Sequence, residues 1–173
     1  MMKINISQAK REIGRKESFS FVGSARDVGL LDEQGWLDAI ISVNGEVTNT
    51  GRFLEIAGVI CAKQVRFVCN RCLEEYSASL EVPFSEEFRE MTLETNEGDN
   101  DFSCYQGDEI DITELVRESL LLAEPLKTLC REDCKGLCLH CGTNLNLTSC
   151  SCLESIVDPR LAVLRQFVKK TEP

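Results

Sequence analysis

The sequence lacks the features that most readily identify a membrane protein or a common enzyme. Its longest apolar runs hold four to six residues, whereas a transmembrane helix needs roughly 20. His140 is the only histidine, so a Ser-His-Asp set has one candidate base and an H-E-x-x-H zinc motif cannot occur. The phosphate-binding pattern G-x-x-x-x-G-K-[ST] is also missing. These absences argue against a membrane partner, a small-molecule substrate and catalysis.

The start of the chain gives no sign of export. The segment MMKINISQAK has neither an apolar core of signal-peptide type nor a small-residue cleavage site. We therefore expect a cytoplasmic protein, in a reducing compartment where static disulfides are rare and clustered cysteines more often bind metal. With 173 residues and a hydrophobic fraction of 43%, the chain suits one moderate domain with a small appendage.

Charge is distributed unevenly along the chain, whose formal net charge is −10. Residues 74–118 hold 15 acidic and 2 basic side chains, while the remainder holds 14 acidic and 17 basic ones. An acidic chain is a poor general binder of nucleic acid. A local basic face is still conceivable near the strands, and we name its members as a candidate functional surface: Arg52, Lys63, Arg66 and Arg71. The alternative is that these charges only solvate exposed strand faces.

Cysteine is the residue that the sequence has in excess. Six of the ten cysteines fall in CREDCKGLCLHCGTNLNLTSCSC, residues 130–152. A C-x2-C pair followed by glycine suits two thiolates on one tetrahedral Zn²⁺. We predict a structural zinc site in this loop and expect His140 in solvent; disulfides or thiol redox chemistry are the alternatives. The predicted ligands are Cys134, Cys138 and Cys141, with Cys130, Cys150 or Cys152 as the fourth.

A second pair, Cys69 and Cys72, lies about 60 residues upstream between two apparent strands. Two cysteines alone cannot complete a four-coordinate site. Three interpretations remain: the pair joins the tail cysteines, it is a redox dithiol, or it packs in a turn without metal. We favour the last, and keep the pair as a second or shared metal site.

The order of predicted elements indicates an α+β fold, with a mostly antiparallel β-rich body and two C-terminal helices flanking the cysteine-rich loop. Strands are expected at 36–47, 52–62, 64–68 and 76–84. The polar, acidic segment after them has little periodicity and is expected to be a loop. The predicted division is a β-rich body at 1–91, an acidic linker at 92–110 and a helical, zinc-binding part at 111–173.

Both helices have recognisable start signals. The first is predicted at 112–123, with Asp111 as N-cap, Glu114 completing a capping box and Pro125 ending it. The second is predicted to begin at Asp158, with a proline in its first helical position. The first helix has one apolar face, and the apolar stripe of the second is expected to pack on the protein's own core rather than on a partner.

Taken together, these motifs resemble a known family. FVCNRCLEEY, then an acidic loop, then IDITELVRESLLLAEPLKTLCREDCKGLCLHCGTNLN, CSC and DPRLAVL are similar in order and spacing to the bacterial YceD family, which includes the large ribosomal RNA subunit accumulation protein. The resemblance runs from about residue 65 to 168. The motif residues it covers are Cys69, Arg71, Cys72, Cys134, Gly136, Leu137, Cys138, Cys141, Gly142, Asn144, Leu145, Asn146, Asp158, Pro159 and Arg160.

The resemblance implies a non-enzymatic factor in the synthesis, processing or stability of large-subunit ribosomal RNA, acting through that RNA or a ribosome-assembly protein. Relatives that lack the cysteine-rich tail imply that zinc stabilises the fold. Two other functions are compatible with the residues: a thiol-redox protein using Cys69 and Cys72, and a zinc-ribbon module that binds nucleic acid directly.

Overall fold

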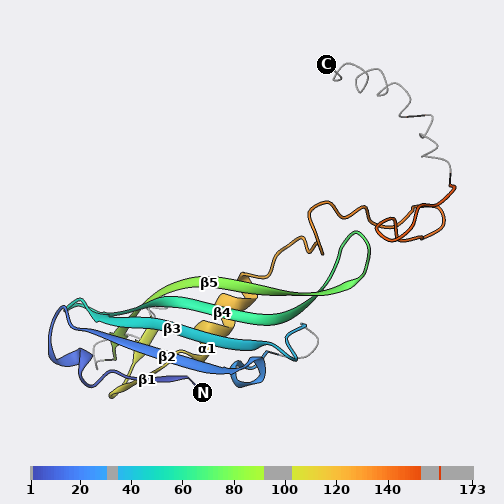
Figure 1. Cartoon of the computed structure of the whole chain (residues 1–173). Coiled ribbons are helices and arrows are strands. Elements are labelled where there is room, and N and C mark those ends of the chain that lie inside the picture. Colours follow the sequence, from blue (N-terminus) through green and yellow to red (C-terminus); the bar gives the residue numbers. More distant parts are fainter. Residues whose placement is uncertain (1, 31–34, 92–102, 153–159, 161–173) are drawn as a thin grey trace.

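The computed structural model describes residues 2–30, 35–91, 103–152 and 160. Within them the chain forms a five-stranded sheet, a two-stranded sheet and one α-helix (Figure 1). The strands are β1 (Lys3–Asn5), β2 (Lys16–Ser24), β3 (Ile40–Asn49), β4 (Leu54–Val68), β5 (Glu75–Glu90), β6 (Ser103–Tyr105) and β7 (Glu109–Asp111). The helices are the 3-10 turns η1 (Ala9–Arg11) and η2 (Ala25–Val28) and the α-helix α1 (Thr113–Leu122).

The large sheet is antiparallel over four strands, as predicted. β2, β3, β4 and β5 pair in chain order, and β6 adds a short parallel edge next to β5. Two glycines lie directly opposite each other at its centre, Gly45 and Gly58. A side chain on Gly58 would meet the backbone oxygen of Asn44 at 2.3 Å, so glycine is required for the strands to approach this closely.

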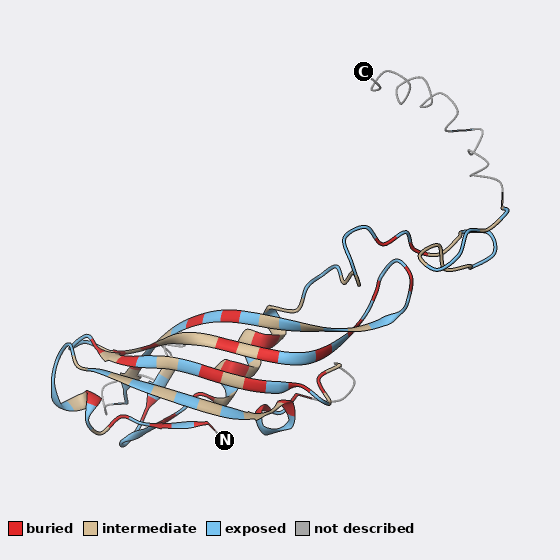
Figure 2. Ribbon diagram, viewed as in Figure 1, coloured by how far each residue is buried: buried red, intermediate tan, exposed pale blue. Residues whose placement is uncertain are grey.

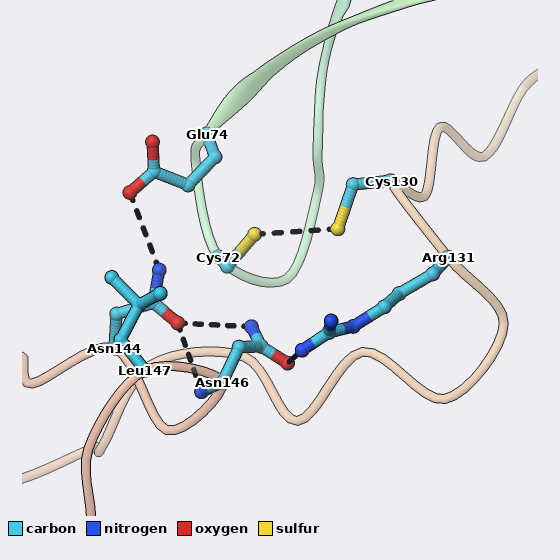
Figure 3. A pocket seen from close by; sticks show the side chains of 7 residues that line it. All are labelled: Cys72, Glu74, Cys130, Arg131, Asn144, Asn146 and Leu147. Carbon is cyan, nitrogen blue, oxygen red and sulfur yellow. Dashed lines mark hydrogen bonds between the residues drawn. The ribbon is translucent and has the colours of Figure 1, made fainter.

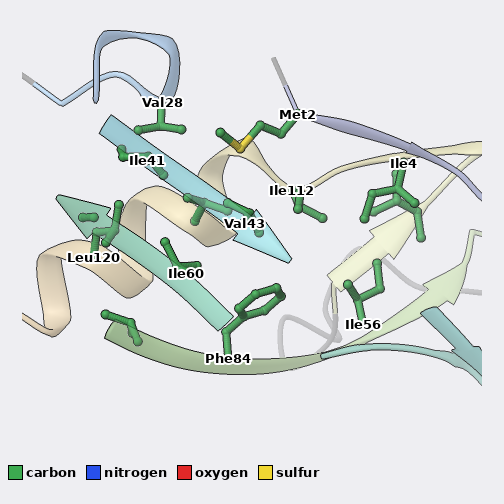
Figure 4. Close-up of a cluster of buried hydrophobic side chains, with 14 of the residues drawn as sticks. Met2, Ile4, Val28, Ile41, Val43, Ile56, Ile60, Phe84, Ile112 and Leu120 are labelled. Carbon is green, nitrogen blue, oxygen red and sulfur yellow. The ribbon is translucent and has the colours of Figure 1, made fainter. Parts of the chain in front are cut away.

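One face of the sheet carries the hydrophobic core. Alternate residues of β3 and β4 are buried, including Ile41, Val43, Ile56 and Ile60 (Figures 2 and 4). Helix α1 lies against this face and buries its own apolar stripe there, formed by Ile112, Val116 and Leu120. The apolar face predicted for this helix therefore packs on the core, while the stripe of the second predicted helix lies outside the described residues.

Trp36 connects the loop before β3 to the end of α1. It is fully buried, and its indole N–H donates to the Glu124 carboxylate at 2.7 Å. A strand was expected to begin at this residue. The observed chain instead turns here, with the Ala39 N–H donating to the Trp36 carbonyl at 2.9 Å, and β3 begins at Ile40.

β4 is one long strand where the sequence predicted two. Its pairing with β5 shifts register between Ala62 and Val65, and Gln64 takes a positive φ of 62°. This is a β-bulge, in which one strand accommodates extra residues without ending. The Gly35 carbonyl accepts the Arg66 N–H at 2.8 Å just beyond the bulge. The β4–β5 hairpin therefore continues past the body of the sheet and carries its tip to the tail (Figure 1).

Three strands, β2, β6 and β7, were not predicted from the sequence. β2 pairs with β3 along its whole length, although its residues were not assigned to a strand. β6 and β7 occupy the C-terminal end of the segment expected to be a loop, where β7 pairs with β1 at the N-terminus. Residues 103–105 and 109–111 thus belong to sheets because partners distant in sequence supply their hydrogen bonds.

The first predicted helix is present, with a different N-terminal cap. α1 spans Thr113–Leu122, and the Asp111 carboxylate accepts the Thr113 N–H at 2.9 Å. Glu114 does not complete a capping box but pairs with Arg117 at 2.6 Å. The second predicted helix, beginning at Asp158, lies outside the described residues, so the structure shows one α-helix before the cysteine-rich loop and does not test the helix after it.

Candidate metal centres

The tip of the β4–β5 hairpin and the tail bring four cysteines together. Cys69 and Cys72 come from the turn between the strands, and Cys130 and Cys134 come from the segment after α1. All four sulfur atoms lie within 4.8 Å of one another. Cys69 and Cys134 are buried completely or nearly so, with exposed fractions of 0% and 3%. We call this group the first centre.

The spacing of the sulfur atoms matches a tetrahedral metal site. The Sγ atoms of Cys69 and Cys134 are 3.7 Å apart, as are those of Cys72 and Cys130. Zn–S bonds of about 2.3 Å in a tetrahedron place the sulfurs about 3.8 Å apart. A disulfide would need about 2.05 Å, and all four residues are free thiols. The donor set, four soft sulfurs without an oxygen ligand, suits Zn²⁺ better than Mg²⁺ or Ca²⁺.

Hydrogen bonds hold the tail against the hairpin tip around this centre. The Asn70 N–H donates to the Thr128 carbonyl at 2.8 Å, and the Thr128 hydroxyl donates to the Val68 carbonyl at 2.6 Å. The Arg71 guanidinium donates to the Cys134 carbonyl at 2.8 Å. In return, the Arg71 carbonyl accepts the Leu137 N–H at 3.2 Å. Backbone pairing therefore sets the position of the tail cysteines relative to the hairpin cysteines.

Asn146 supports the first centre from the tail side. Its amide donates to the Cys134 Sγ at 3.3 Å and to the Asn144 side-chain oxygen at 2.9 Å, while its own oxygen accepts from Arg131 at 2.8 Å (Figure 3). Asn144 in turn donates to Glu74 at 3.2 Å. Donors of this kind orient a thiolate ligand and stabilise its charge. The sequence identified Asn144 and Asn146 as motif residues but did not predict their role beside the cysteines.

A second group of four cysteines lies entirely within the tail. It comprises Cys138, Cys141, Cys150 and Cys152, whose sulfurs also lie within 4.8 Å of one another. We call this group the second centre.

The turn that forms the second centre is held by its own backbone. The Gly142 N–H bonds to the Cys138 carbonyl at 2.9 Å, the Cys138 N–H bonds to the Thr143 carbonyl at 2.8 Å, and Gly142 adopts a φ of 71°. His140 is exposed and donates its backbone N–H to the Cys138 Sγ at 3.5 Å. The second centre is more accessible than the first, because Cys141 is exposed and the other three are partly buried.

The thiols of each centre titrate far from their usual range in opposite directions. The backbone N–H of Cys130 lowers the pKa of Cys69 to about 6, whereas burial and a hydrogen bond with Cys72 raise the pKa of Cys130 to about 12. In the second centre, hydrogen bonds from Thr143 lower the pKa of Cys141 to about 6, and those with Cys141 and Cys138 raise the pKa of Cys152 to about 12. Four neighbouring thiols cannot all ionise in the absence of a cation, because the thiolates repel one another. A divalent cation between them would compensate this negative charge.

The structure groups the cysteines differently from the sequence expectation. Cys134 was expected beside Cys138 and Cys141, but it lies with the hairpin pair in the first centre. Cys130 also belongs there, while Cys150 and Cys152 both complete the second centre. The hairpin pair joins tail cysteines, which was one of the three interpretations considered. Counting four close pairs, and hence eight ligands, is the signal that would have indicated two sites, although it does not tell which pairs share one.

The four basic residues predicted as a functional surface do not converge. Arg52 lies in the turn between β3 and β4, and Arg71 lies at the hairpin tip, at the other end of β4. The 15 residues of β4 span about 50 Å. Arg66 pairs with Asp38 at 2.8 Å, and the Arg71 guanidinium is used to hold the tail. Lys63 is exposed beside the bulge.

Comparison with known proteins gives a family match over the part of the chain that contains both centres. The family model described as "Large ribosomal RNA subunit accumulation protein YceD" matches residues 61–168. A chloroplastic maize protein named "Large ribosomal RNA subunit accumulation protein YCED homolog 1" is 51% identical over 45 residues. That alignment covers 25% of this chain and 15% of the maize protein, so the chain spans only a small part of that relative.

Bacterial relatives match over longer regions. An uncharacterised protein of Mycobacterium tuberculosis is 29% identical over 174 aligned residues, covering 96% of this chain and 81% of the relative. The uncharacterised YlbN of Bacillus subtilis is 31% identical over 105 residues, covering 60% of each protein. No solved structure matches. None of the helices in the described ranges has the length and hydropathy that a membrane span requires.

Proposed function

Because this chain belongs to the YceD family of large ribosomal RNA subunit accumulation proteins, we propose that it is a non-enzymatic factor in the synthesis, processing or stability of large-subunit ribosomal RNA. The family match carries this proposal. The matched region, residues 61–168, includes all eight cysteines of the two centres. The plant relatives are also named for the large ribosomal RNA subunit. The function therefore resides in the part of the chain from the β4–β5 hairpin onward.

Zinc at both centres is part of the proposal. The 3.7 Å separations between sulfur atoms in the first centre favour a tetrahedral ion. The first centre joins the hairpin to a tail segment that has little apolar material of its own: Leu129 and Leu137 are only partly buried. A zinc ion there would act as a structural clip, because metal binding then contributes directly to folding.

A thiol-redox activity is less well supported. The Cys69–Cys72 pair lies on a hairpin turn and not at a helix N-terminus, and the low pKa of Cys69 comes first from the backbone N–H of Cys130 in the same four-cysteine group. Both thiols also have two further cysteines beside them. A group of four sulfurs favours metal coordination over reversible pairing of two.

Charge favours a protein partner over direct RNA contact. Four thiolates and one Zn²⁺ carry a charge of −2, so two such centres make the formal net charge of −10 more negative still. RNA binding is driven by basic surfaces, and the basic residues of the strand region are dispersed or already paired. We propose that the chain acts on ribosomal RNA through a ribosome-assembly protein.

Complementation of a deletion strain tests the function and its dependence on the first centre. The double variant Cys69→Ser/Cys72→Ser removes two ligands, and Cys61→Ser/Cys104→Ser removes two cysteines outside both centres. We expect the ratio of large-subunit to small-subunit ribosomal RNA to fall on deletion, to recover with the wild type and the control variant, and to stay low with Cys69→Ser/Cys72→Ser. An unchanged ratio in the deletion strain would refute the proposed function.

A further inference from the structure

The open edge of β5 offers backbone hydrogen-bonding groups to a partner. β6 pairs only with Phe88–Glu90, and in the described part of the chain no strand pairs with the preceding residues of β5 on that side. The Met91 N–H donates to the Tyr105 carbonyl at 2.9 Å, so odd-numbered residues of β5 face this edge. Ser85 therefore directs its N–H and C=O groups, and Glu87 its N–H, away from β4 next to the end of β6, while the parallel pairing of Phe88 with Ser103 uses the Glu87 carbonyl.

Pro83 limits how far a strand could add along this edge. Pro83 lies two residues before Ser85, so its backbone nitrogen points to the same edge. Because proline has no N–H there, no hydrogen bond to β4 is lost. An added strand would thus bond to Ser85 and Glu87 and lose one bond at Pro83. Proline at an edge discourages long, nonspecific pairing, which confines the accessible ladder to the two residues beside β6.

A groove lies beside this part of the edge. It has a volume of about 510 Å³ and runs between β5 residues 82–86 and the last two turns of α1. Its apolar lining includes Val82, Phe84 and Leu115, and Leu122 borders it with 87% of its surface exposed. An apolar groove rimmed by polar residues, here Glu86 and Glu118, is a typical feature of a protein contact site.

The charge around the groove selects the kind of occupant. Glu86 and Glu118 line it, while Glu81 and Glu87 lie on the same strand, β5, with their side chains on its opposite, exposed face. None of these four carboxylates forms an ion pair with another described residue. A second copy of the chain would bring the same carboxylates to the same edge and be repelled, and RNA would be repelled for the same reason.

We propose that the β5 edge and the adjoining groove bind an extended segment of a protein partner in which basic and apolar residues alternate. The backbone of the segment bonds to Ser85 and Glu87, its apolar side chains enter the groove, and its basic side chains meet the carboxylates. Strand addition of this kind takes affinity from the backbone and specificity from alternate side chains. This inference goes beyond the proposed function and does not depend on it, because the surface alone defines the partner's chemistry.

Binding of a labelled peptide to the full chain tests the proposal. The probe is a nine-residue peptide of alternating lysine and valine, measured by fluorescence anisotropy against zinc-loaded protein, with nine-residue lysine and alternating glutamate-valine peptides for comparison. We expect the lysine-valine peptide to bind at least tenfold more tightly than either. The variant Ser85→Pro, which removes one edge N–H, should weaken binding at least tenfold, whereas Ser77→Pro, the same change farther along the edge, should alter it less than twofold.

The charge contribution has its own variant. Glu81→Gln/Glu87→Gln, on the face of β5 that the basic side chains share, should weaken binding about tenfold and reduce its salt dependence, while Glu12→Gln/Glu75→Gln, with equal charge loss away from this site, should not. The proposal would be overturned if the lysine peptide bound as tightly as the lysine-valine peptide. It would also be overturned if the Ser85→Pro variant, with its fold intact by circular dichroism, bound the lysine-valine peptide as tightly as the wild type does. A dimer in sedimentation that Ser85→Pro disrupts, or competition by a short single-stranded RNA, would overturn it too, since each identifies a different occupant.

Discussion

Removing metal should release the tail while leaving the β body folded. The core of the body, built on β3, β4 and α1, shares no buried residue with the small group around Cys69, Cys72 and Cys134. Treatment of the protein with a strong zinc chelator is therefore expected to free the segment after α1 without melting the sheet.

The magnitudes show what the proposed zinc ions would contribute to the tail. Ordering residues 126–152 costs roughly 25 kcal/mol at about 1 kcal/mol per residue. Seven hydrogen bonds join hairpin and tail directly, from Asn70, Thr128, Arg71, Leu137 and Asn144, and return about 7 kcal/mol in all. Zinc at the two proposed sites, at about 10 kcal/mol each, would supply the difference.

Limited proteolysis measures this release. Lys127, Arg131 and Lys135 are trypsin sites within the tail, and cleavage there is read by mass spectrometry. We expect these cuts to be at least about 100-fold faster after chelation, corresponding to a loss of roughly 3 kcal/mol or more in protection, while the fragment that contains β1 to α1 persists. Equal cleavage rates with and without chelator would refute the reasoning, as would collapse of the whole chain at once.

Three further changes have defined outcomes. Asn146→Ala removes the donor to the Cys134 sulfur and should weaken zinc binding about 10- to 100-fold in a chelator competition; an unchanged affinity would deny it a supporting role. Gly58→Ala brings a methyl group within 2.3 Å of the Asn44 oxygen and should lower the free energy of unfolding by about 3 kcal/mol in urea titration; a loss below about 0.5 kcal/mol would contradict the close strand approach. Asp27 caps η2 together with Ser24, whose backbone N–H and hydroxyl lower the pKa of the Asp27 carboxyl. The Asp27 carboxylate therefore stabilises the fold above the unfolded pKa of about 3.9. This stabilisation is lost as pH falls through the lower, folded-state pKa. Asp27→Asn should therefore flatten the stability profile between about pH 5 and 3, and an identical acid limb would show that the cap is not formed.

Local signals were sufficient for the elements whose stabilising contacts are close in sequence. Helix α1 was predicted to within one residue at each end, because its apolar spacing, the acidic cap and Pro125 all lie within a short stretch. The β4–β5 hairpin was recognised from alternation on both sides of the Cys69–Cys72 turn. In contrast, β6 and β7 have three residues each, too few for any period, and they are strands only because β5 and β1 supply partners.

The grouping of the cysteines depended on the fold in the same way. Cys69 and Cys134 are 65 residues apart, and their proximity follows from the length of the β4–β5 hairpin and the path of the chain after α1. Spacing along the sequence identified C-x2-C pairs but gave no means of deciding which pairs share an ion. The contacts of Arg71 with the tail were equally invisible, because a turn alone does not require its charge.

Zinc content measured on the full chain tests the central claim most directly. Protein purified without added metal or chelator should contain two zinc ions per chain by inductively coupled plasma mass spectrometry. Cys69→Ser/Cys72→Ser and Cys150→Ser/Cys152→Ser should each contain one, and Cys61→Ser/Cys104→Ser should keep both. A wild-type chain with no zinc, or with a single ion that both variants of the centres lose together, would contradict the account of two separate metal centres.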